Sequence, residues 1–97
     1  MIVARTVFQA KYGKANELVA HLKKAQDVFV KYGYPKGRVL TDLSGNMFTI
    51  VWENDWESLA AWDVSRSKVF SVPEFRPWFA EMEKLVESGS REFYSVE

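Results

Sequence analysis

Trp62 and Arg66 are the two residues whose types and spacing most directly indicate a binding site. Four positions apart on a helix, they share one face, so the guanidinium can lie over the indole ring or hold an anionic or enolate oxygen in a pocket. The alternative is that Trp62 packs in the core while Arg66 reaches water along its aliphatic stem. Trp52 fits either core packing or ligand contact, and its indole N–H needs a partner if the ring is buried. Packing is the simpler explanation for Trp56, which we place at the start of the same helix.

His21 and Tyr94 are the candidates for moving a proton. His21 is the only histidine, so it is the one side chain that titrates near neutrality without assistance. It could act as a general base that faces a cavity between sheet and helices, or lie half in water at the edge of the first helix. Tyr94 could donate a hydrogen bond to a substrate, or pack in the core with its hydroxyl at the sheet edge. A single histidine without any cysteine supplies no set of metal ligands, so no metal site is expected.

The composition excludes several classes of partner. The 97 residues suffice for one domain, residues 1–97, and the 13 basic and 13 acidic side chains give a formal net charge of zero. The chain has no basic block that would indicate a nucleic-acid or lipid-surface partner. There is neither an apolar run of the roughly 18 residues that a membrane helix needs nor a secretory signal, so we expect a cytoplasmic protein with no membrane association. Motifs typical of nucleotide binding, serine hydrolysis and zinc proteolysis are missing.

Hydrophobic periodicity predicts the elements of the first half. Residues 1–10 are apolar and β-branched and predict a strand. Residues 14–32 have a helical period, and Gly33 is placed to cap the helix before Pro35. Residues 38–43 and 47–54 predict two strands joined by a short turn at "SGN", as in a hairpin.

The second half predicts a broken helix and a last strand. Asn54, with Glu57 three residues later, fits a capping box for a helix from about Asp55 to Phe70. The prolines of "SVPEFRP" interrupt this helix, and Pro77 opens a third one. "ESGS" is expected to end the third helix, and "REFYSVE" to form the final strand.

The order β-α-β-β-α-β, with its second helix broken in two, predicts an α+β ferredoxin-like fold with a four-stranded antiparallel sheet. The strand over residues 47–54 is apolar on both faces, as is the first strand, so we expect two copies to form a homodimer through the sheet face that the helices leave open. Arg5 lies on that face and would need a partner, either Asp42 or Glu53, with Arg38 extending the network. A structural ion pair at the interface and a catalytic role both remain open for these charges.

Four segments resemble the dimeric α+β barrel superfamily: "KYGK" after the first strand, the "VWE" strand that leads to the helix with Trp62, "PEF", and the closing "REFYSV". Within it, the chain is most similar to NIPSNAP-like proteins and to antibiotic-biosynthesis-monooxygenase-like relatives. The resemblance spans nearly the whole chain. It implies a dimeric α+β barrel in which two sheets face each other, and any ligand site lies between each sheet and its own helices.

The resemblance also bears on cofactors. Heme-degrading members of the superfamily carry a Trp to which Trp62 corresponds, an Asn on the first strand and a heme-ligating His. Here the Asn position is approximately Thr6 and the His position falls close to Phe79, so neither heme nor any other cofactor is implied. In cofactor-free quinone-forming relatives the important residues are scattered; Trp62 can be placed among them, whereas Arg66 and Tyr94 match in residue type alone.

We therefore expect a NIPSNAP-like dimeric α+β barrel protein that binds a small hydrophobic or aromatic molecule between sheet and helices, at Thr6, Trp52, Trp62, Arg66 and Tyr94. One alternative is a cofactor-free monooxygenase or isomerase that acts on a hydroxylated aromatic or polyketide-like substrate. In that case His21 or Tyr94 would transfer the proton and Arg66 would hold the developing oxyanion. A second alternative is a non-catalytic homodimer that binds a protein partner. The sequence leaves open whether the protein is an enzyme.

Overall fold

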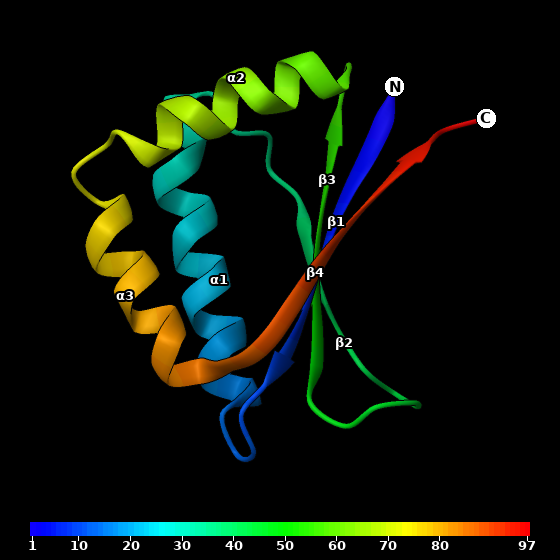
Figure 1. The fold of residues 1–97 in the computed structure, drawn as a ribbon, viewed down its shortest axis with the longest axis vertical. Coiled ribbons are helices and arrows are strands. Elements are labelled where there is room, and N and C mark those ends of the chain that lie inside the picture. Colours follow the sequence, from blue (N-terminus) through cyan, green and yellow to red (C-terminus); the bar gives the residue numbers. More distant parts are fainter.

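A four-stranded antiparallel sheet forms one layer of the protein, and helices cover one of its two faces (Figure 1). The structure, a computed structural model, describes residues 1–97. The strands are β1 (Ile2–Ala10), β2 (Arg38–Thr41), β3 (Thr49–Trp56) and β4 (Val86–Ser95), in the spatial order β2-β3-β1-β4. The two chain ends lie near each other at one end of the sheet, where the Val96 N–H donates to the Met1 carbonyl.

Three helices lie against the same face of the sheet (Figure 1). They are α1 (Ala15–Phe29), continued by the 3-10 turn η1 (Val30–Tyr32), then α2 (Leu59–Phe70) and α3 (Phe75–Leu85). Gly33 closes η1 with a φ of 90°, a left-handed conformation that glycine adopts without strain, as its predicted capping role requires. The α+β ferredoxin-like fold with a broken second helix is thus confirmed.

Strand pairing decides which side chains face the helices. β1 and β3 pair so that Thr6 lies opposite Trp52 and Arg5 lies opposite Glu53. Because successive side chains alternate between faces, Trp52 belongs to the row that is buried under the helices and Glu53 to the row on the other side. The buried core unites the helix-facing row with α1, α2 and α3 and comprises Ala10, Leu18, Leu22, Ala25, Phe29, Ile50, Trp52, Val69, Met82 and Leu85.

The structure corrects the predicted start of the second helix. β3 continues through Asp55 to Trp56, and Ser58 caps α2 by accepting a hydrogen bond from the Ala61 N–H at 3.1 Å. Asn54 is buried in the strand, where its side-chain amide donates to the Pro35 carbonyl at 3.0 Å. Pairing with β1 keeps this segment extended, and the local capping pattern is outweighed. Trp56 is therefore the buried last residue of β3, and it does not start the helix.

Three further boundaries differ from the prediction. α3 begins at Phe75, so Pro77 lies inside its first turn, where a missing N–H costs no hydrogen bond. α3 ends at Leu85, and "ESGS" belongs to β4, because these polar residues find backbone partners along β1. The hairpin connection spans residues 42–48 and is longer than the predicted turn; Asp42 closes it by accepting from the Thr49 N–H at 2.9 Å.

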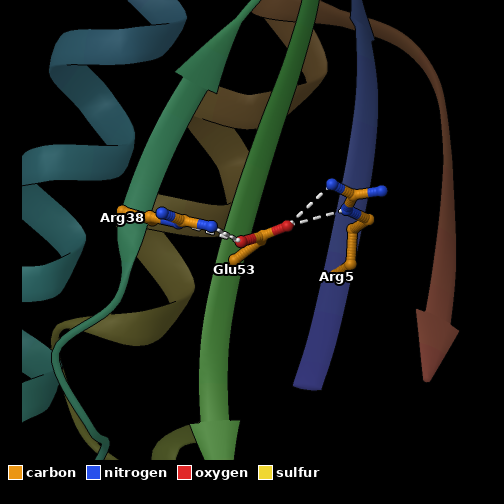
Figure 2. A network of polar contacts seen from close by, with 3 residues as sticks. All are labelled: Arg5, Arg38 and Glu53. Atoms are coloured by element: carbon orange, nitrogen blue, oxygen red, sulfur yellow. Dashed lines mark hydrogen bonds and ion pairs between the residues drawn. The ribbon is translucent and has the colours of Figure 1, made fainter. Parts of the chain in front are cut away.

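No element covers the second face of the sheet (Figure 1). We call this the open face; its half-buried apolar side chains are Val3, Val7, Leu40 and Val51. Glu53 lies on this face between Arg5 and Arg38 (Figure 2). Its carboxylate oxygens are 2.8 Å from the Arg5 guanidinium and 2.9 Å from that of Arg38. Glu53 is thus the partner that Arg5 needs, whereas Asp42 is occupied in the hairpin connection.

None of the helices combines the length and the apolar character needed to cross a membrane.

Candidate ligand-binding site

A cavity of about 150 Å³ lies between the covered face of the sheet and the helices. Most of its lining is aromatic: Phe8, Phe29, Tyr34, Trp52, Trp62, Phe70, Phe75, Trp78 and Phe79. The other lining residues are Ala4, Thr6, Asn54, Arg66, Val69, Met82 and Arg91. Phe70 and Phe79 are more than half exposed, at 51% and 54%, and so lie where the cavity meets solvent. An aromatic wall with few polar groups is typical of small-molecule sites.

Arg66 stacks on the ring of Trp62, as the spacing of the two residues predicts. The guanidinium carbon lies 5.0 Å from the centroid of the Trp62 ring and 5.0 Å from that of Phe70. The carboxylate nearest to the Arg66 guanidinium is that of Asp63, 3.9 Å away. The Asp63 side chain is 70% exposed, so water weakens this ion pair strongly. Trp62 and Arg66 both line the cavity.

Arg91 is a cavity residue that the sequence interpretation missed. It pairs with Thr6 in the β1–β4 register, donates from Nε to the Thr6 hydroxyl at 3.3 Å, and places its guanidinium carbon 5.3 Å from the Trp62 ring. Phe93, two residues further along β4, contacts the same ring edge-on at 4.9 Å. Strict alternation along "REFYSV" was the available signal, because it places Arg91 and Phe93 on the face opposite Tyr94.

Tyr34 is a second missed residue, in the irregular segment that follows η1. Its ring packs edge-on against Trp56 at 4.9 Å and lies 6.1 Å from Trp52. Burial raises the pKa of the Tyr34 hydroxyl above its ordinary value of 10.0, and the charges of Arg91 and Arg66, with the side chain of Trp62, oppose this only in part. The phenol therefore stays protonated at neutral pH and supplies an O–H donor.

Trp52 is at once core and cavity wall. The residue is 7% exposed, packs in the central cluster and lines the cavity. Its buried Nε1 has no hydrogen-bond partner within the chain, and neither has that of Trp56. An unpaired buried donor costs about 1–3 kcal/mol, so the Trp52 indole at the cavity wall is not fully satisfied by the protein alone.

The residues proposed for proton transfer lie elsewhere. Nε2 of His21 donates to the Trp78 carbonyl at 2.8 Å, while the Trp78 indole donates to the His21 carbonyl at 3.1 Å. The two rings stack with centroids 5.1 Å apart, and His21 lines a separate, more open hollow. Tyr94 pairs with Val3 and therefore lies on the open face, with 51% of the residue exposed.

The structure thus gathers Thr6, Trp52, Trp62 and Arg66 around one cavity and leaves out His21 and Tyr94. No group of three or more His, Cys, Asp or Glu side chains is arranged to hold a metal ion.

Comparison with known proteins finds similar structures but no similar curated sequence. Neither a protein-family model nor a curated protein sequence matches the chain. A NIPSNAP domain protein from Burkholderia xenovorans superposes with a TM-score of 0.89 at 15% identity, over 100% of this chain and 95% of the other. A NIPSNAP family protein from Agrobacterium tumefaciens gives a TM-score of 0.89 at 13% identity, over 99% and 85%.

A candidate antibiotic biosynthesis monooxygenase from Deinococcus radiodurans is similar over 100% of this chain and 93% of its own, with a TM-score of 0.73 at 17% identity. At such identities the likeness concerns the fold and not the chemistry. The resemblance seen in the sequence is confirmed at that level: along its whole length, the chain has the α+β fold of NIPSNAP family proteins.

Proposed function

We propose that the protein binds a small hydrophobic or aromatic molecule between its sheet and its helices. The observation that carries this proposal is the cavity of about 150 Å³ with its largely aromatic wall. A cavity of about this size, engineered into another protein, accommodates benzene, so the volume suits a ligand with one aromatic ring. Trp52 lines this cavity and its buried indole N–H has no partner within the chain, which further supports a site completed by a ligand.

Titration with single-ring aromatic molecules tests the proposal. We expect a ligand to quench tryptophan fluorescence and to raise the melting temperature, because Trp52, Trp62 and Trp78 line the cavity and binding stabilises the folded state. Trp62→Ala should abolish both effects. Leu59→Ala on the same helix is the matched control, since Leu59 is 54% exposed and lies outside the cavity. Binding that is equally strong in Trp62→Ala, or no response to any ring of this size, would contradict the proposal.

The cavity also bears on the two alternative functions, protein binding and catalysis. A hollow with an aromatic wall favours small-molecule binding over a purely protein-binding role. Catalysis by a monooxygenase or isomerase stays a prediction: of the three residues proposed for it, Arg66 alone lines the cavity.

We infer in addition that two copies pair through their open faces. The uncovered apolar rows of Val3, Val7, Leu40 and Val51 support this, since a monomer would leave an apolar sheet surface in water. Glu53 neutralises much of the charge that Arg5 and Arg38 would bring into such an interface. Light scattering should then give a molar mass of about twice the 11.2 kDa of one chain.

A further inference from the structure

The charges that line the cavity are all of one sign. Arg66 and Arg91 are its ionisable cations, and no aspartate or glutamate is among the lining residues. Arg91 forms no ion pair, and the single carboxylate near Arg66 is the largely exposed Asp63. Two guanidinium groups beside an aromatic wall, without a compensating carboxylate, favour a negatively charged occupant.

Both guanidiniums lie close to the same ring. Their central carbons lie 5.0 Å (Arg66) and 5.3 Å (Arg91) from the centroid of Trp62. A guanidinium that stacks on a ring keeps its in-plane N–H groups free, and these groups match the two oxygens of a carboxylate. Arg91 uses its Nε–H for the Thr6 hydroxyl, so its terminal N–H groups remain available.

The exposure of the lining residues indicates which end of a ligand would face solvent. The Arg66 side chain is 38% exposed, and its stacking partner Phe70 lies where the cavity meets solvent. The deeper wall is formed by buried apolar residues such as Val69 and Met82. An anionic group held beside the arginines thus stays close to water and loses little hydration, while an apolar ring can enter the cavity.

We propose that the cavity selects a single-ring aromatic carboxylate, with its ring inside the aromatic wall and its carboxylate held by Arg66 and Arg91 beside Trp62. This inference rests on the proposed function and names the class of ligand for the same site. The raised pKa of Tyr34 is consistent with it, because the neutral phenol adds a donor and no competing negative charge.

Three probes separate the inference from the proposed function: benzoate, benzyl alcohol and acetate. Benzoate should bind at least about tenfold more tightly than benzyl alcohol, which has the ring without the charge, and than acetate, which has the charge without the ring. Raising sodium chloride should weaken benzoate binding and leave benzyl alcohol binding unchanged, because salt screens the ionic contribution alone. Isothermal titration calorimetry measures both effects on the unmodified protein.

Matched variants assign the effect to the two arginines. Arg66→Gln and Arg91→Gln should each weaken benzoate binding about tenfold more than they weaken the binding of benzyl alcohol, because each substitution removes a charged donor to the carboxylate. Arg76→Gln is the control, since Arg76 is exposed on α3, lies outside the cavity and has no ion pair. Circular dichroism and the melting temperature verify that each variant is folded.

The possible failures are distinct. If benzyl alcohol binds as tightly as benzoate and both bindings are lost in Trp62→Ala, the anion preference is overturned and the proposed function stands. If neither ring-containing probe binds, both fall. Benzoate binding that is insensitive to salt and to both glutamine variants would place the anion elsewhere and overturn the inference.

Discussion

At the scale of single residues, Glu53 is the most constrained charge in the molecule. Its side chain is 11% exposed and receives the guanidiniums of Arg5 and Arg38 from the two neighbouring strands (Figure 2). Burial alone would raise the pKa of the Glu53 carboxyl, but hydrogen bonds from Arg38 and Arg5, together with their charges, bring it below its ordinary value of 4.5. The ionised carboxylate therefore joins β1, β2 and β3 on the open face.

This lowered pKa predicts a pH dependence of stability. As the pH falls below 4.5, the unfolded chain takes up a proton at this glutamate before the folded chain does, so the free energy of unfolding decreases. The contribution of Glu53 is complete above 4.5 and is lost once the pH has passed below the pKa of the folded state. In Glu53→Gln the slope of stability against pH should be smaller in this window, and unfolding at neutral pH should cost about 1–2 kcal/mol less.

Urea unfolding at a series of pH values and at fixed protein concentration measures both quantities. Asp55→Asn is the control, because Asp55 lies on the same strand and face but is exposed and has no ion pair. An unchanged slope in Glu53→Gln would show that the two arginines do not hold the carboxylate in solution.

The sequence predicts those cavity residues whose position follows from helical spacing or from strand alternation. Trp62 and Arg66 share a helical face, and alternation places Thr6 and Trp52 on the helix-facing rows of their strands. Tyr34 lies in an irregular segment without any period. Arg91 is 85 positions from Thr6, and its place depends on the register of a strand pair that no local pattern defines.

At the scale of elements, the start of α2 shows how long-range pairing competes with local signals. Asn54 matches a capping pattern, but this residue is paired with Ala4 and buried within β3. The chain leaves the sheet only after Trp56, and Ser58 provides the first side chain that can cap the helix. The same competition extends β4 back to Val86. Strand β1 and helix α1 were predicted closely, because their apolar periods are long and agree with their tertiary roles.

Ser58→Ala should therefore destabilise the protein by about 1 kcal/mol, because the Ala61 N–H loses the hydroxyl that it donates to at 3.1 Å. Thermal unfolding followed by circular dichroism measures the change. Ser67→Ala is the matched control in the interior of the same helix: it is exposed, and alanine there should be neutral or slightly stabilising. Equal effects of the two substitutions would contradict the assigned cap.

At the scale of the whole molecule, the two faces of the sheet present different surfaces. The covered face builds the cavity from side chains of one chain alone, while the open face presents apolar rows and the Arg5–Glu53–Arg38 network. A domain of 97 residues buries a modest share of its surface, so covering the open face with a second copy would add stability that the core of one chain does not supply. The proposed dimer and the proposed ligand site should then be separable by mutation.

Val7 and Val51 test this separation, because they are cross-strand neighbours on the open face. In a two-fold dimer, Val7→Lys or Val51→Lys would bring two unpaired charges into the interface, which should weaken self-association by about a hundredfold or more. Light scattering should show the mass falling towards 11.2 kDa, whereas Val64→Lys, at a 60% exposed position on α2, should leave it unchanged. The monomeric variant should still bind ligand, since no residue of the cavity lies on the open face; an unmodified protein that is itself monomeric would contradict the pairing.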